Sequence, residues 1–139
     1  HSLNPQNHRE GSFSMGHQKI ILLADSSREF CWLMQMIAKQ YNYLFMTTVG
    51  TGRDVLLSTR KQMPDLLLMD ISLPDISGLT VLEKLAQQGR APKTIFLSSM
   101  VSNRLAERAL KLGALYFIPK PFHADALFDI IYNLFYDQP

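Results

Sequence analysis

The feature of this sequence that most constrains its fold is a regular alternation between short apolar runs and longer segments with helical spacing. The apolar runs are KIILLA, YLFMTT, DLLLMD, KTIFLS and ALYFIP, and each has the length of a single strand. Helical periodicity between and after them predicts helices over residues 27–40, 51–62, 78–88, 102–112 and 123–136. This order predicts βα units with a parallel sheet. The nearly continuous apolarity of IILL and LLLM indicates strands covered on both faces.

Five such units favour an open, doubly wound α/β sheet over a closed barrel, because a barrel needs about eight units and about 250 residues. The chain has 139 residues and contains no internal repeat. We therefore expect one domain over residues 19–136. In its first helix, the spacing i, i+3, i+4, i+7 predicts a buried face formed by Phe30, Leu33, Met34 and Ile37.

The composition excludes several functional classes. A net charge of +2 is too small to indicate nucleic-acid binding, and no apolar run approaches the roughly 18 residues of a membrane span. Cys31 is the only cysteine, so an intrachain disulfide is impossible, and a reducing compartment such as the cytoplasm is expected. Residues 1–14 are polar and lead directly into Met15, so we interpret them as an expression scar or a disordered leader.

Polar side chains follow the predicted strands where each strand ends. Asp25 and Ser26 end the first strand, Asp70 the third, Ser98 the fourth and Lys120 the fifth. Each residue alone has an ordinary structural explanation, as a helix cap, a turn residue or a solvated cation. In open α/β sheets, however, the ligand crevice lies outside the carboxyl ends of the strands. The occurrence of these residues together therefore favours a functional site.

These residue types suit phosphoryl transfer to a carboxylate. An aspartate can act as a nucleophile when cations neutralise the charge on the phosphoryl oxygens. Asp70 is the candidate nucleophile because the apolar DLLLM segment presents it on a rigid strand. Mg²⁺ needs only one or two protein carboxylates, so Asp25 and Asp70 could hold it. Ser98 could donate a hydrogen bond to a phosphoryl oxygen, and Lys120 could pair with it.

Residues from Lys19 to about Tyr136 resemble the receiver domain of two-component response regulators. The motifs that carry this resemblance are LLAD, LLLMDISLPDISGL, TIFLSS and GALYFIPKPF. The sporulation-phosphorelay type is the most similar, because a similar ADxxRE follows its first strand and a similar YFIxKPF closes its fifth. The resemblance implies a flavodoxin-like (βα)5 fold, in which a five-stranded parallel sheet has the order 2-1-3-4-5.

The resemblance also implies roles for individual residues. It implies Asp70 as phosphoacceptor, Asp25 as an acidic-pocket residue, Lys120 as the pocket lysine, Ser98 as the switch hydroxyl and Phe117 as the switch aromatic. Asp25, Asp70 and the backbone carbonyl of Ser72 would bind Mg²⁺. A cis bond between Lys120 and Pro121 is implied as well, and X-Pro bonds are where cis peptides occur.

The sequence departs from the family at Ser26. Receivers carry two adjacent acids after the first strand, and the second acid is a direct Mg²⁺ ligand. Here Ser26 takes that second position, because shifting the register by one residue would put Glu29 on the buried helix face. Counting Asp25, Asp70 and Lys120, the pocket has a charge of about −1 instead of −2, so Mg²⁺ binding should be weaker. Whether Ser26 itself contacts the metal is left open.

Two surfaces are candidates for partner binding. Trp32 and Met36 are neighbours on the first helix, which in receivers commonly meets a sensor histidine kinase or phosphotransfer protein. Arg104, Arg108 and Lys111 share a face of the helix over 102–112. In receivers this region, with the fifth strand and last helix, serves output contacts or a homodimer. Both sets have an ordinary alternative as solvated surface.

Three functions remain to be distinguished. The first is a receiver switched by phosphorylation of Asp70, which at most assists its own phosphorylation and dephosphorylation. The second is a pseudo-receiver that acts by constitutive protein contacts, as Ser26 would favour. The third is a flavin-binding flavodoxin-like carrier, which Asp25 disfavours because a carboxylate after the first strand would repel the flavin phosphate.

Overall fold

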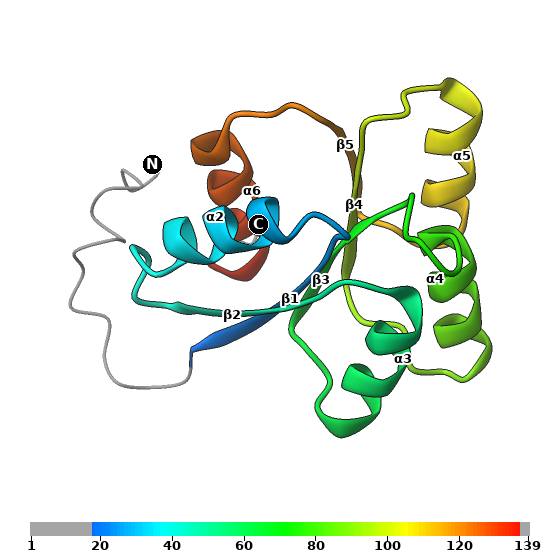
Figure 1. Ribbon diagram of the computed structural model, residues 1–139, viewed down its shortest axis with the longest axis horizontal. Helices are drawn as coiled ribbons and strands as arrows, with labels where there is room; N and C mark the ends of the chain where they lie inside the picture. Colours follow the sequence, from blue (N-terminus) through cyan, green and yellow to red (C-terminus); the bar gives the residue numbers. More distant parts are fainter. Residues whose placement is uncertain (1–17, 137–139) are drawn as a thin grey trace.

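The computed structural model describes residues 18–136, which form a parallel β-sheet with helices on both faces (Figure 1). Its elements are β1 (Lys19–Ala24), α2 (Arg28–Ala38), β2 (Leu44–Val49), α3 (Gly52–Lys61), β3 (Leu66–Asp70), α4 (Gly78–Gln87), β4 (Thr94–Ser98), α5 (Asn103–Lys111), β5 (Tyr116–Pro119) and α6 (Ala124–Tyr136). The sheet order is β2-β1-β3-β4-β5, with every pairing parallel. The predicted fold class is therefore confirmed. The segment 1–14, interpreted above as a scar or leader, lies outside the described residues.

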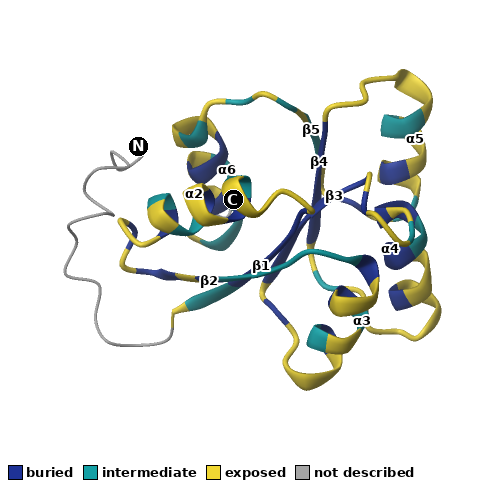
Figure 2. Ribbon diagram, in the orientation of Figure 1, coloured by how far each residue is buried: buried dark blue, intermediate teal, exposed yellow. Residues whose placement is uncertain are grey.

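Two helical layers enclose the sheet. Helices α2 and α6 cover one face, and α3, α4 and α5 cover the other (Figure 1). Successive side chains of a strand point to opposite faces. Ile21 and Leu23 of β1 thus pack toward α2 and α6, whereas Leu22 and Ala24 pack toward the opposite helices. This explains the continuous apolar runs, and β3 and β4 are buried along their whole length (Figure 2).

Capping side chains set where the helices begin. Ser27, Thr51, Ser77 and Ser102 each accept a hydrogen bond from a backbone N–H in the first turn of the helix that follows. Each helix is one or two residues shorter than predicted at one or both of its ends, because apolar periodicity does not distinguish a cap from a helical residue. Within residues 18–136, no helix has the length and apolarity that crossing a membrane requires.

One prediction about the first helix is wrong. Leu33 is 49% exposed, whereas Cys31, Met34 and Ala38 are the buried residues of α2. Phe30 and Ile37 are partly buried against the same cluster. The helix is therefore rotated relative to the predicted face, so that the small Cys31 and Ala38 side chains lie closest to the sheet.

The sheet order places the ends of β1 and β3 beside each other. The chain leaves β1 for β2 on one side and returns to β3 on the other, so β1 and β3 flank the point where strand order reverses. Ala24 pairs with Met69, and the residues that follow them are Asp25 and Asp70. Ligands bind at such a switch point in open α/β sheets.

The loop after β3 is held in place by close backbone contacts. The Gly78 N–H donates to the Ile71 carbonyl at 2.8 Å, and a Cβ atom at Gly78 would lie 2.5 Å from the Asp70 carbonyl oxygen. Asp75, in the same loop, accepts hydrogen bonds from the backbone N–H groups of Arg53 at 2.9 Å and Gly52 at 2.8 Å. These bonds lower the pKa of Asp75 below its ordinary value. The loop is thus anchored to the start of both α3 and α4.

We expect Gly78→Ala to destabilise the fold by roughly 1–3 kcal/mol, because the added methyl would force α4 away from the end of β3. Urea unfolding followed by circular dichroism measures the loss. Gly50→Ala is the matched control, since a Cβ there meets nothing closer than the Asp25 carbonyl oxygen at 3.9 Å. Equal stability of the two variants would contradict the close approach of α4.

Candidate functional site

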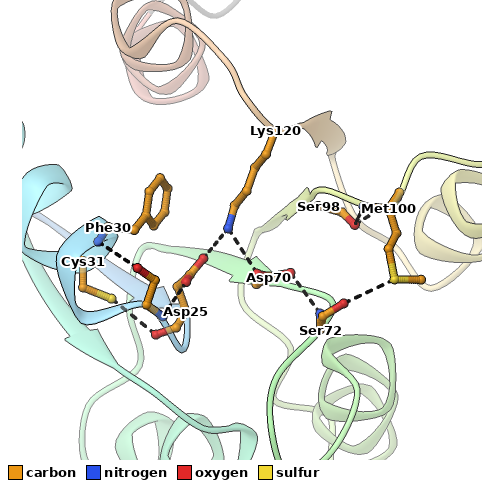
Figure 3. Close-up of polar contacts among 9 residues, drawn as sticks. Asp25, Phe30, Cys31, Asp70, Ser72, Ser98, Met100 and Lys120 are labelled. Carbon is orange, nitrogen blue, oxygen red and sulfur yellow. Dashed lines mark hydrogen bonds and ion pairs between the residues drawn. The ribbon is translucent and has the colours of Figure 1, made fainter.

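Two buried carboxylates share one ammonium group at the carboxyl edge of the sheet (Figure 3). Lys120, which follows β5, donates from Nζ to Asp25 Oδ2 and, at 3.1 Å, to Asp70 Oδ2. Asp25 is 3% exposed and Asp70 is 8% exposed. The ends of three strands thus converge on one charge cluster, as predicted from the sequence. The Lys120–Pro121 peptide bond is cis, as the family resemblance implies.

The second oxygen of each carboxylate is held by the backbone. Asp25 Oδ1 accepts from the Ser27 N–H at 2.8 Å, and Asp70 Oδ1 accepts from the Ser72 N–H at 2.9 Å. Each carboxylate therefore has one oxygen bound to its own loop and one bound to Lys120. This arrangement fixes the orientation of both groups.

The charge state of Lys120 follows from opposing effects. Burial lowers the pKa of its ammonium, but the hydrogen bonds to Asp25 and Asp70 outweigh burial, so that the pKa is raised above its ordinary value. Lys120 therefore stays protonated over the whole physiological range. A cation fixed beside Asp70 can neutralise negative charge brought to that carboxylate.

The predicted switch hydroxyl is buried and is hydrogen-bonded to Met100 rather than to Asp70. Ser98 Oγ donates to the Met100 carbonyl at 3.0 Å and accepts from the Met100 N–H at 3.0 Å. The Ser72 hydroxyl donates to Met100 Sδ at 3.6 Å (Figure 3). Met100 therefore connects the loops that follow β3 and β4. Sequence reasoning missed Met100, because an exposed methionine carries no chemical signal of its own.

Phe30 is the second residue that sequence reasoning missed at this site. It was predicted only as part of a buried helix face, yet its ring lies beside the Lys120 ammonium, with Nζ 4.4 Å from the ring centroid (Figure 3). An aromatic ring attracts a cation at this distance. The available signal was its position in the first helical turn after Asp25, five residues along the chain.

Ser26 lies on the surface of the loop after β1 and brings no carboxylate to the cluster. It is exposed, as is Glu29, whereas Asp25 is buried, in agreement with the register chosen from the sequence. Asp25, Ser26 and Trp32 line a cavity of about 290 Å³ between α2 and the end of β2. Among residues 18–136 no group of three or more His, Cys, Asp or Glu residues could hold a metal ion.

Asp25 and Asp70 nevertheless provide the small number of protein carboxylates that Mg²⁺ needs. Mg²⁺ accepts one or two carboxylates and retains several waters, and Asp25 and Asp70 face one another across a single ammonium. Any ion binding both carboxylates would compete with Lys120 for their Oδ2 atoms. The residues therefore fit a weakly bound ion and not a tightly held one.

The predicted partner residues lie on two separate surfaces. Trp32 is 63% exposed and Met36 is 42% exposed on the outer side of α2. Arg104, Arg108 and Lys111 are exposed on α5, which packs beside β5. Phe117 of β5 is partly buried against the cluster under α3, α4 and α5.

Comparison with known proteins agrees with the fold. The model of the response regulator receiver domain family matches residues 21–132. A signal receiver domain from Vibrio parahaemolyticus is 29% identical with a TM-score of 0.78, covering 83% of this chain and 88% of that one. A CheY-like response regulator receiver domain protein from Methanospirillum hungatei JF-1 is 26% identical with a TM-score of 0.78, covering 84% and 93%. The non-phosphorylated HemR receiver domain from Leptospira biflexa shares the fold at 22% identity and a TM-score of 0.78, covering 88% and 98%.

We expect Lys120→Met to destabilise the protein by about 3 kcal/mol at neutral pH, because it leaves two buried carboxylates without their shared cation. Since the pKa of Lys120 is raised on folding, its stabilising effect is complete below the unfolded pKa near 10.4 and is lost only as pH rises through the folded value. Chemical unfolding of the wild type and of Lys120→Met from pH 6 to pH 11 measures how the difference in their free energies of unfolding depends on pH.

The exposed Lys111→Met provides the control for that experiment. It removes one lysine from the surface of α5 and should change stability by less than about 0.5 kcal/mol. If the two variants unfolded alike at neutral pH, the bridging role of Lys120 would be wrong.

Proposed function

The chain belongs to the response regulator receiver domain family, and from this premise we propose that phosphorylation of Asp70 switches it between two signalling states. One observation carries the proposal. Asp70 is a buried carboxylate at the end of a central strand, and it is hydrogen-bonded to an ammonium group. Receiver domains are signalling domains, and they receive phosphoryl groups from histidine kinases or phosphotransfer proteins.

The chemical step is a displacement at phosphorus. A carboxylate oxygen of Asp70 attacks the phosphorus of the donor, a new P–O bond forms, and the bond to the donor nitrogen or oxygen breaks with its electron pair leaving on the donor. Lys120 neutralises negative charge on the transferred group, because its Nζ already lies 3.1 Å from Asp70 Oδ2. The Ser72 N–H at Asp70 Oδ1 keeps the carboxylate oriented for attack.

Mg²⁺, where bound, would be held by Asp25, Asp70 and the backbone carbonyl of Ser72, and would neutralise further charge on the phosphoryl oxygens. Side chains of the protein position Lys120 and provide a hydrogen bond to the phosphoryl group. Asp25 holds Lys120 in the pocket before the phosphoryl group arrives. For Ser98 to donate a hydrogen bond to the phosphoryl group, its two hydrogen bonds to the Met100 backbone must break. The loss of these bonds would change the conformation of the loop before α5 and, through this loop, the conformation around Phe117.

Partner binding follows from the two exposed surfaces. We propose that Trp32 and Met36 contact the kinase or phosphotransfer protein, since α2 begins directly beside the phosphoacceptor pocket. Arg104, Arg108 and Lys111, with β5 and α6, would form an output or homodimer contact. A cytoplasmic location, the domain limits 19–136 and the likeness to the sporulation-phosphorelay type stay predictions.

A pseudo-receiver is the second candidate. Two observations favour it: Ser26 provides no acid, and Lys120 bridges both carboxylates, so that a metal ion would have to compete with its ammonium for their oxygens. In that case the protein would act through constant contacts of the same surfaces. Phosphorylation by a small phosphodonor distinguishes the two candidates.

We expect the full chain to gain one phosphoryl group from acetyl phosphate in the presence of Mg²⁺, and Asp70→Asn to gain none, because Asp70, at the end of the central strand β3, takes the position of the phosphoacceptor in the receiver family, whereas Asp25, which shares Lys120 with it, takes the position of an acidic-pocket residue. Intact-mass spectrometry measures the added phosphate. Asp75→Asn controls for general effects of removing a carboxylate. Label that persists in Asp70→Asn would refute the assignment, and an unmodified wild type would favour the pseudo-receiver.

We expect Ser26→Asp to bind Mg²⁺ at least about tenfold more tightly, because it restores a charged ligand close to a divalent ion. The chain has one tryptophan, Trp32, which lines the cavity beside Asp25 and Ser26 and can report the titration by fluorescence. Ser26→Ala should match the wild type. Equal affinities in Ser26→Asp and Ser26→Ala would mean that position 26 does not face the metal.

A further inference from the structure

We propose that Phe30 is a positioning residue that holds the ammonium of Lys120 between Asp25 and Asp70, so that the first turn of α2 sets where this cation meets the incoming phosphoryl group. The inference rests on the proposed function, because it assigns a task within that same pocket. It concerns a residue whose side chain has no acid, base or hydrogen-bonding group.

The contacts of Lys120 Nζ carry the inference. An ammonium group has three N–H donors. Two of them are directed at Asp25 Oδ2 and Asp70 Oδ2, and on the α2 side the Phe30 ring lies 4.4 Å away (Figure 3). The negative face of an aromatic ring attracts a cation and excludes water from it. The ammonium is therefore held by two carboxylates and one ring, and the ring is the only one of the three that would not bind a metal ion.

The position of the ring is itself fixed by two contacts. The Phe30 N–H donates to Ser27 Oγ at 3.1 Å, in the cap of α2. The ring also packs edge-on against Phe122, with centroids 6.1 Å apart and an interplanar angle of 86°. Phe122 follows Lys120 by two residues, so the loop after β5 contacts α2 at both places. Movement of α2 relative to this loop would consequently displace Lys120.

The ring also borders an open apolar cavity that Lys120 shares. This cavity has a volume of about 350 Å³ and is lined by Phe30, Leu33, Phe122 and Lys120, among others. Without the ring, the ammonium of the flexible Lys120 side chain could leave the two carboxylates and become hydrated in the enlarged cavity. Its bond to Asp70 would then be weakened, and fewer molecules would present a cation to the phosphoryl group.

Ordinary core packing is the alternative explanation for Phe30, and three variants separate it from positioning. Phe30→Leu keeps an apolar side chain but removes the ring face. Phe30→Tyr keeps the ring face. Leu33→Ala removes apolar volume from the same cavity, at a residue that is 49% exposed.

The test combines two measurements on the full chain. The first is the proton chemical shift of the Lys120 ε-CH₂ group, measured by NMR with ¹³C-labelled lysine and assigned with Lys120→Met. The ring should shift this signal upfield in the wild type, in Phe30→Tyr and in Leu33→Ala, and Phe30→Leu should abolish the shift. The second is the concentration of beryllofluoride, a phosphoryl mimic, needed for half-saturation with Mg²⁺ present, which should rise about threefold to tenfold in Phe30→Leu alone.

Each outcome decides the inference. An unshifted ε-CH₂ signal in the wild type, or equal beryllofluoride affinity in Phe30→Leu and the wild type, would overturn it. An equal loss of affinity in Leu33→Ala and Phe30→Leu would show packing and would also overturn it. If the wild type bound no beryllofluoride, the proposed function would fail, and the upfield shift and its loss in Phe30→Leu would still decide whether Phe30 positions Lys120.

Discussion

The site depends on one interaction, the sharing of the Lys120 ammonium by Asp25 and Asp70. Two carboxylates buried this deeply would repel one another without a cation between them. Because each acid ends a central strand and the lysine follows β5, the interaction connects strands that are distant in the sequence. The same interaction leaves Asp70 partly neutralised, which is the condition in which a negatively charged phosphoryl donor can approach it.

Satisfying this interaction constrains the loops around it. The N–H groups of Ser27 and Ser72 bind the remaining carboxylate oxygens, so the loops after β1 and β3 cannot move independently of the acids. Met100 connects the loops after β3 and β4 through Ser72 and Ser98. A dianionic phosphoryl group at Asp70 would compete for Lys120 and Ser98 together. In the function proposed here, this competition would couple the pocket to α5 and β5, where the proposed output surface lies.

The sequence alone predicted most of the fold and the charged part of the site, for physical reasons. Strand ends in a parallel sheet meet at one edge, so Asp25, Asp70 and Lys120 could be grouped without coordinates. The buried face of α2 could not be obtained as reliably, because Leu33 and Cys31 are both apolar and only packing decides which one faces the sheet. Likewise Phe30 is an ordinary apolar residue in sequence, and its contact with Lys120 depends on how α2 meets the loop after β5.

The measurement that tests this account most directly is a comparison of amide NMR spectra of the full chain with and without beryllofluoride and Mg²⁺, with binding established independently. If Lys120 and Ser98 couple the phosphoryl group to the rest of the protein, the amides of Ser98, Met100 and Phe117 will shift together on binding, and Asp70→Asn will show no such change. Bound beryllofluoride with these amides unmoved would contradict the account.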